Sequence, residues 1–240
     1  MTTLLYQMDS YLSEFDATVS IVDPAAHAVV LDQTAFFPGG GGQVHDLGCL
    51  SFGDCRADLK RIQHSPQGVL HIFDEGQQLP QPGESVHGSI DWDHRYKVMR
   101  THTAMHILCG TIYRDYGALV TGGNMDPLSG RMDFEFEHLT KELVAVIEES
   151  VNKEVQAARE VRVAIHTREE AFKIPDLIRT KINLLPEHVT EIRTIEIVGL
   201  DLQADGGTHV RNTSEVGHIH VTDYKSKGKI NKRIYLELDA

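Results

Sequence analysis

The segment Arg100–Leu108, with the sequence RTHTAMHIL, constrains this chain more than any other stretch. Its histidines, His102 and His106, are four positions apart. On an α-helix this spacing places both imidazoles on one face, one turn apart, where they can reach a single metal ion. The segment therefore predicts a helix that carries two metal ligands.

A second pair of metal-binding residue types occurs much later in the chain. In Ala204–Val210, ADGGTHV, the residues Asp205 and His209 have the same spacing across two glycines. The chain has 14 histidines, so one His-x3-His pair can arise by chance, but two pairs are much harder to obtain. Folding that brings the pairs together would form a four-ligand zinc site. Asp205 would be either a ligand or a group that orients a histidine.

Such a site suits hydrolysis, because bound zinc polarises a carbonyl and lowers the pKa of bound water. The helix differs from the HExxH helix of metalloproteases, since Thr103 follows His102 and no glutamate precedes His106. We expect Cys109, one turn further on, to be a core residue rather than a nucleophile.

The composition is that of a globular protein with one large domain or two small ones. The chain has 240 residues, of which 41% are hydrophobic and 24% charged. No apolar run approaches the ~20 residues of a membrane helix, and the N-terminal residues do not resemble a secretory signal. We therefore expect no membrane contact. Three scattered cysteines indicate a reducing compartment, so we expect a cytoplasmic protein.

The patterns predict an α+β protein of two domains. In residues 1–90, short strand-like runs separated by glycine and proline turns indicate a small β-barrel. In residues 91–240, helices and strands are mixed, and we expect the helices to pack on an antiparallel sheet. A helix is predicted from Trp92 to Tyr116, ended by Gly117, with one buried stripe of side chains: Val98, Thr101, Met105, Leu108 and Ile112.

Two loops offer further polar groups. Gln33–Gly48 contains four consecutive glycines but matches neither a P-loop nor a dinucleotide fingerprint. It is either a flexible connection between strands or a glycine-rich lip of a site, with Gln43 as its polar group. Thr121 and Asn124 lie in a second glycine-bearing loop, where they could line a polar pocket or simply form a turn.

The formal net charge of -12 does not favour tight binding of nucleic acid. The segment Tyr224–Arg233, YKSKGKINKR, is an exception with five basic residues and no acid. It could contact phosphates, although on charge alone a solvated hairpin is the better interpretation.

Four segments resemble the alanyl-tRNA editing family, which comprises free-standing AlaX proteins and the editing domain of alanyl-tRNA synthetase. RTHTAMHIL is similar to the family's R-T-H-(S/T)-A-x-H helix. GGTHVRNTSEVG is similar to its second ligand motif, TAFFPGGGGQVHDLG to its barrel signature, and KGKINKRIYLEL to its closing strand. The segments lie in order across nearly the whole chain. Because the sequence ends at residue 240 without a long helical extension, it resembles the medium-length AlaX class.

The resemblance implies an aminoacyl-tRNA deacylase that hydrolyses the ester of serine or glycine on the alanine-specific tRNA. It implies one zinc ion held by His102, His106, Asp205 and His209. The family most often has cysteine at the position of Asp205. A carboxylate is a harder ligand than a thiolate and would hold zinc more weakly.

The resemblance also implies catalytic roles for Thr121 and Gln43 and substrate-binding roles for other residues. Thr121 would contact the serine hydroxyl, and Gln43 with Gly41 and Gly42 would close over the aminoacyl end. Asn124 and Arg100 are further candidates for substrate contact. We expect weak, salt-sensitive tRNA binding through the basic segment together with Arg95, Lys97 and Arg100, and no stable protein partner.

Two other functions stay open from the sequence. The chain could be a metal-stabilised RNA-binding module without catalysis, since four protein ligands are typical of structural zinc. It could also be a zinc hydrolase that acts on small esters or amides.

Overall fold

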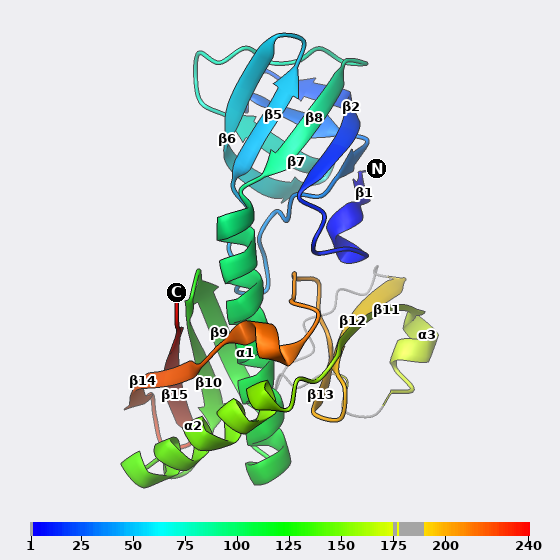
Figure 1. Cartoon of the computed structure of the whole chain (residues 1–240). Coiled ribbons are helices and arrows are strands. Elements are labelled where there is room, and N and C mark those ends of the chain that lie inside the picture. Colours follow the sequence, from blue (N-terminus) through cyan, green and yellow to red (C-terminus); the bar gives the residue numbers. More distant parts are fainter. Residues whose placement is uncertain (1, 175–176, 178–189) are drawn as a thin grey trace. The chain divides into compact units, whose positions relative to one another are not determined.

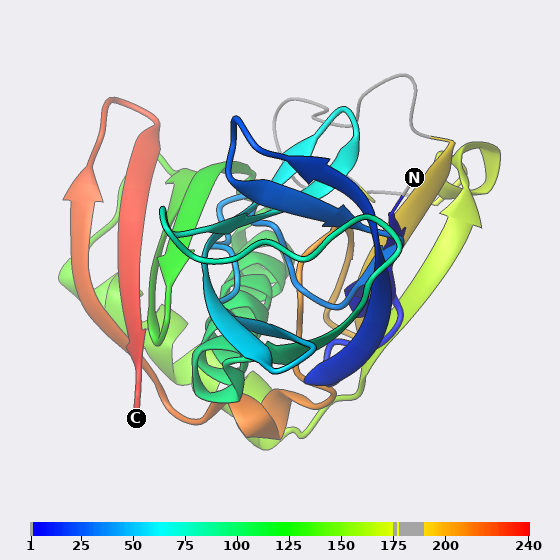
Figure 2. The same cartoon turned by 90° about the horizontal axis from the view of Figure 1, so that it is seen from above.

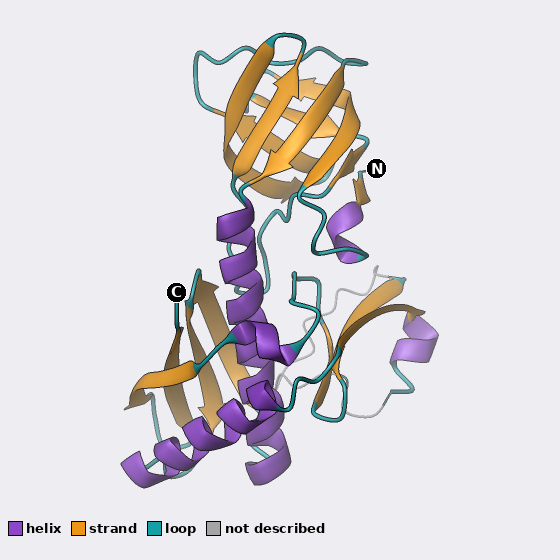
Figure 3. Ribbon diagram, viewed as in Figure 1, coloured by secondary structure: helices purple, strands orange, loops and turns teal. Residues whose placement is uncertain are grey.

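A computed structural model describes residues 2–174, 177 and 190–240. The chain divides into two compact units, Met1–Tyr96 and Lys97–Ala240. Figure 3 shows that strands make up most of the first unit, whereas the second combines helices with strands. The predicted α+β class with an N-terminal barrel is therefore confirmed.

Six antiparallel strands close the barrel of the first unit in the order β2-β3-β7-β6-β5-β8 (Figures 1 and 2). In β2 the buried residues Phe15, Ala17 and Val19 alternate with exposed ones, because successive side chains of a strand point to opposite faces. Gly88 lies opposite Phe15, and a Cβ at this glycine would be 2.4 Å from the Phe15 ring. The strands are β2 (Glu14–Asp23), β3 (Ala28–Leu31), β5 (Gly48–Phe52), β6 (Cys55–Ser65), β7 (Gly68–Phe73) and β8 (Ser85–Ile90).

A short parallel pair accompanies the barrel within the first unit. Strand β1 (Thr3–Leu4) pairs with β4 (Gln33–Thr34), and the 3-10 helix η1 (Leu5–Gln7) follows β1.

Helix α1 (Trp92–Tyr116) has the predicted bounds and ends at Gly117, whose φ is +66°. The five residues of the predicted stripe are all buried. The burial extends further, however, because every residue from Thr101 to Ile112 is buried. Polar side chains of this segment, among them Thr103 and His106, therefore have partners inside the protein.

The described residues of the second unit form two antiparallel sheets. One has the order β14-β15-β10-β9, and α2 (Lys141–Gln156) packs against β14. The other has the order β11-β12-β13. The strands are β9 (Val120–Asp126), β10 (Ser129–Glu135), β11 (Val161–Thr167), β12 (Glu191–Ile197), β13 (Asp201–Ala204), β14 (Ile219–Ser226) and β15 (Asn231–Leu238).

Two short helices also occur in the part of the second unit that the structure describes. The α3 helix (Arg168–Ala171) begins with a capping box between Thr167 and Glu170, and the 3-10 helix η2 (Thr213–Val216) begins with one between Asn212 and Glu215. Among the described residues, no helix combines the length and apolar character needed to cross a bilayer.

Candidate metal centre

The two predicted pairs of side chains meet within the second unit. His102, His106, Asp205 and His209 each offer one ligand atom, and these atoms lie within 4.8 Å of one another. Asp205 Oδ2 is 3.4 Å from His102 Nε2 and 3.8 Å from His106 Nε2, and Asp205 Oδ1 is 3.2 Å from His209 Nε2. Three imidazole nitrogens thus surround one carboxylate.

These distances fit a tetrahedral metal ion. Ligand bonds of about 2.1 Å around zinc place neighbouring donor atoms about 3.4 Å apart. The separations of 3.4 and 3.8 Å from Asp205 Oδ2 to His102 Nε2 and His106 Nε2 are close to this value, and His209 Nε2 lies 3.2 Å from the other carboxylate oxygen. The donor set of three imidazoles and one carboxylate also suits zinc, so the residues present could hold such an ion.

Helix α1 supplies two of the donors, and the segment after β13 supplies the others. Asp205 N donates to Arg193 O on β12 at 3.1 Å, which continues the pairing of β13 with β12. Asp205 Oδ1 accepts a hydrogen bond from Gly207 N at 2.6 Å. This is an Asx turn, in which an aspartate side chain binds the backbone two residues later. The turn fixes the carboxylate and returns the chain so that His209 reaches the same centre.

Further polar groups hold two of the histidines by their second ring nitrogen. Asp201 Oδ2 is 3.1 Å from His106 Nδ1, and its side chain is fully buried. Gln203 Nε2 donates to the same Asp201 oxygen at 2.6 Å. Thr103 Oγ1 is 3.1 Å from His209 Nδ1. These contacts direct the Nε2 atoms of both histidines toward Asp205, as outer partners of metal-binding histidines do.

Burial and charge set the ionisation of the group. Burial lowers the pKa of His102 against the opposing effect of Asp205, and it also lowers the pKa of His209 well below the ordinary value. For His106, hydrogen bonds to Asp201 and Asp205 outweigh burial and raise the pKa to about 9. For Asp205, burial is outweighed by the surrounding histidines, and its pKa is well below the ordinary value. The anionic carboxylate and the neutral imidazoles of His102 and His209 can bind a cation, and His106 joins them as a ligand once it releases its proton.

Sequence reasoning did not find Asp201, Gln203 or Thr103. Strand β13 itself was not predicted, because its four residues, DLQA, are too few to show a clear alternation. Cys109 is buried with its Sγ 3.3 Å from Gln203 Nε2, in agreement with the predicted core position.

The glycine-rich loop belongs to the first unit and forms a tight turn. Gly40 and Gln43 exchange two backbone hydrogen bonds, of 3.0 and 2.9 Å. Between them Gly41 and Gly42 have φ values of +60° and +91°, as a type I′ turn requires at both central positions. Gln43 is buried and Gly41 is exposed. The roles predicted for these three residues at the aminoacyl end stay predictions.

Thr121 and Asn124 lie on the edge strand β9. A register shift leaves Thr121 as an extra residue, because Asp133 pairs with Gly122 but Phe134 with Val120. The Thr121 hydroxyl donates to Asn231 Oδ1 at 2.9 Å and its side chain is exposed.

Asn124 is exposed and lines a cavity of about 290 Å³ on the sheet together with Arg131 and Tyr235. A side chain at Gly123 would instead meet Met105 of helix α1, at 3.0 Å. Contacts of Thr121 and Asn124 with a substrate stay predictions.

The prediction that Arg95 contacts tRNA is wrong. Its side chain is completely buried within the first unit, forms an ion pair with Asp46, and donates to Ser10 O and Ala35 O. A guanidinium enclosed in this way cannot reach a phosphate.

The prediction is also wrong for one residue of the basic segment. Lys232 is buried, and its Nζ donates to Gly228 O and Lys229 O across the β14–β15 hairpin. Arg100, a candidate for substrate contact, donates to Val216 O at 3.1 Å and to Asp239 O at 2.7 Å. Its substrate role stays a prediction.

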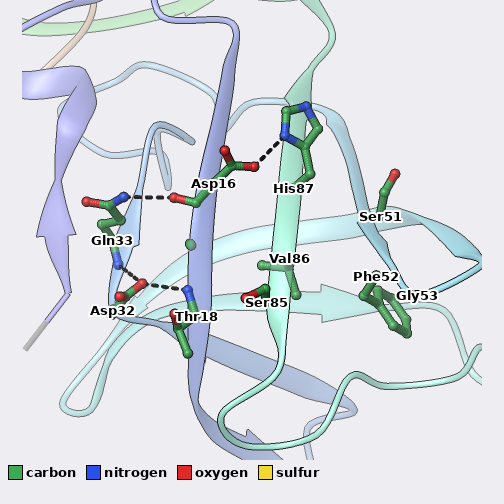
Figure 4. Close-up of a pocket in the computed structure, with 11 residues that line it drawn as sticks. Asp16, Thr18, Asp32, Gln33, Ser51, Phe52, Gly53, Ser85, Val86 and His87 are labelled. Atoms are coloured by element: carbon green, nitrogen blue, oxygen red, sulfur yellow. Dashed lines mark hydrogen bonds and ion pairs between the residues drawn. The ribbon is translucent and has the colours of Figure 1, made fainter.

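A hollow of about 620 Å³ lies on the surface of the barrel (Figure 4). Several of its polar groups are paired with one another. His87 Nδ1 is 2.8 Å from Asp16 Oδ1, and Asp32 Oδ1 accepts from Thr18 N at 2.8 Å and Gln33 N at 2.9 Å. None of the residues predicted for the site lines this hollow.

Comparison with known proteins gives the family. Residues 7–94 match the tRNA synthetases class II (A), and residues 192–235 match the second additional domain of threonyl and alanyl tRNA synthetases. The chain is 40% identical over 238 residues to the alanyl-tRNA editing protein AlaX-M of Saccharolobus solfataricus, with 98% of each chain covered. The chain belongs to the AlaX-M family.

Another AlaX-M protein, from Methanosarcina mazei, is 36% identical over 249 residues, which cover 99% of this chain and 97% of the relative. The alanine-tRNA ligase of Pyrobaculum neutrophilum is 39% identical over 227 residues, which are 92% of this chain but 25% of the ligase. The resemblance inferred from the sequence motifs is confirmed. The AlaX-M family thus shares one region with a much larger synthetase.

Proposed function

We propose that this chain is a trans-editing hydrolase that deacylates Ser-tRNA or Gly-tRNA made with the alanine-specific tRNA. The proposal rests on the AlaX-M family membership and on one observation, the meeting of His102, His106, Asp205 and His209 in a single buried cluster. We propose that these four residues bind one zinc ion. The substrate of the protein would be a mischarged tRNA in the cytoplasm.

A zinc ion in this cluster would polarise the ester carbonyl and lower the pKa of a water molecule. The protein's own groups would hold the donors in position. Asp201 would keep His106 Nδ1 protonated so that Nε2 can bind, and Thr103 would do the same for His209. The Asp205 side chain is 19% exposed, whereas those of the histidines are 7% exposed or less, so the substrate would approach on the side of Asp205.

Such an activity solves a problem of discrimination. A synthetase pocket for alanine cannot strongly reject glycine, which is smaller, or serine, which adds only a hydroxyl. A second, hydrolytic site removes the products of these errors. For this site we propose Thr121 as the group that pairs with the serine hydroxyl, and Gln43 with Gly41 and Gly42 as the group that covers the aminoacyl end. Asn124 and Arg100 would make further substrate contacts.

The test combines metal analysis with deacylation assays. Purified protein would be assayed on Ser-, Gly- and Ala-charged tRNA, before and after chelation and after zinc is restored. We expect hydrolysis of Ser-tRNA or Gly-tRNA, little hydrolysis of Ala-tRNA, and loss of activity both on chelation and in a His209→Gln variant. The exposed His138 gives a matched control, and His138→Gln should retain activity.

The same assay tests the other candidate functions. Four protein ligands are typical of structural zinc, which favours an RNA-binding module as the second candidate. Retained tRNA binding without turnover of any mischarged tRNA would favour that module and refute the hydrolase. Turnover of small esters or amides alone would point to a general zinc hydrolase.

A further inference from the structure

A second cluster of metal-binding side chains lies on the surface of the second unit. Glu148 of α2 and His218 and His220 beside or within β14 each offer one ligand atom, and these atoms lie within 4.8 Å of one another. None of the three belongs to the cluster around Asp205. The rings of His218 and His220 are 4.5 Å apart between centroids.

The backbone between the two histidines is fixed to helix α2. Asn152 Nδ2 donates to Ile219 O at 2.8 Å, and Ile219 N donates to Asn152 Oδ1 at 2.9 Å. Ile219 is itself fully buried. The residues on both sides of it are therefore held beside α2 before any ligand binds.

The carboxylate of the cluster is anchored in the same way. One oxygen of Glu148, Oε2, accepts a hydrogen bond from Val221 N at 3.1 Å. This contact leaves Oε1 to bind a ligand. Glu148 and His218 also line a cavity of about 520 Å³ on this face of α2, through which solvent ions can reach them.

A further carboxylate orients His220. Asp239 Oδ1 is 2.8 Å from His220 Nε2. A carboxylate accepts a hydrogen bond from a ring N–H, so this contact keeps the proton on Nε2 and leaves the lone pair on Nδ1. Carboxylate, histidine and metal in this order form a common arrangement in metal sites. The last residues of the chain are held in turn by the Arg100 bond to Asp239 O.

We propose that Glu148, His218 and His220 form a surface site for a divalent transition-metal ion such as zinc, oriented by Asp239. Two imidazoles and one carboxylate leave at least one position for water, and such donors favour zinc, nickel or copper over magnesium or calcium. An ion bound there links α2, β14 and, through Asp239, the C-terminal residues. It therefore stabilises the folded second unit by mass action.

The test counts zinc ions per chain by equilibrium dialysis and metal analysis. The double variant His218→Gln/His220→Gln should bind one zinc fewer than the unchanged protein, whatever the occupancy of the buried cluster. Added zinc should also raise the melting temperature of the double variant less than that of the unchanged protein, because only the surface site has been removed. Glu149→Gln, an exposed carboxylate of the same helix, and His138→Gln are the matched controls and should bind the full number.

Asp239→Asn is a milder change at an exposed C-terminal residue. It should lower the zinc affinity of the surface site roughly 10-fold. Equal zinc counts in the double variant and the unchanged protein would overturn the proposal. If the double variant does not fold, His220→Gln alone replaces it, because this side chain is 46% exposed. The total zinc count tests the buried cluster separately. One zinc ion in the unchanged protein and none in the double variant would support the surface site and refute zinc binding by the buried cluster.

Discussion

The Asp201–His106 contact offers the sharpest test of the buried centre. We predict that Asp201→Asn weakens zinc binding without removing any donor atom. Asparagine has nearly the same shape, but it is neutral, so the charge-assisted hydrogen bond to His106 Nδ1 is lost. Its amide group can also turn so that N–H faces the ring, which would favour the wrong tautomer of His106.

The magnitude follows from the position of Asp201. Its side chain is fully buried, 3.1 Å from His106 Nδ1, so solvent cannot replace it. Loss of such an outer partner weakens metal binding about 10- to 100-fold. This factor corresponds to about 1.4 to 2.7 kcal/mol, since each tenfold change is about 1.4 kcal/mol.

The assay is competition for zinc between the protein and a chelator of known affinity. Asp223→Asn makes the same change of charge at a carboxylate of the second unit that is 48% exposed and pairs with Lys225, so it is the matched control. Zinc affinity of Asp201→Asn that equals that of the control would refute the role of Asp201. A full loss of binding would also contradict it, because that result would make Asp201 a ligand.

Three further changes test other parts of the structure. His71 is buried in the barrel, and burial lowers its pKa to about 4. Between pH 6.5 and 4 the unfolded protein therefore binds more protons than the folded protein, so the free energy of unfolding falls as the pH falls. This loss should reach about 3 kcal/mol and disappear in His71→Gln, as urea unfolding across this pH range would measure; the same pH slope in both proteins would contradict it. Arg95→Met should lower the free energy of unfolding, measured with urea, by about 3–5 kcal/mol, because it leaves the buried Asp46 without its ion-pair partner. A decrease below about 1 kcal/mol would be evidence against a buried pair. Thr121→Val should reduce the preference for Ser-tRNA over Ala-tRNA in deacylation, and an unchanged ratio of rates would exclude Thr121 from selectivity.

Periodicity and spacing sufficed for the central helix and for the two ligand pairs. Helix α1 has the predicted bounds because its apolar spacing is regular and Gly117 ends it. The His102–His106 and Asp205–His209 pairs were found because one helical turn and one Gly-Gly turn are local geometries.

Residues whose environment depends on distant contacts could not be assigned in this way. A basic side chain in a polar segment is usually exposed, but Arg95 is buried because Asp46 and two carbonyls from other parts of the first unit surround it. The direction of Thr121 depends on a register shift between β9 and β10, which no periodicity reveals.

The sequence by itself therefore indicated the two pairs of candidate metal ligands, the helix that carries one pair, and the class of the fold. Only the tertiary structure decided that the two pairs meet, that Asp201 and Thr103 orient them, and that a second cluster forms around Glu148 and His220. The physical reason is that helix caps, turns and periodic faces arise from interactions a few residues apart. A metal centre instead requires donor atoms within a few ångströms of one another, and for residues separated by many positions that proximity exists only once the sheets and helices have packed.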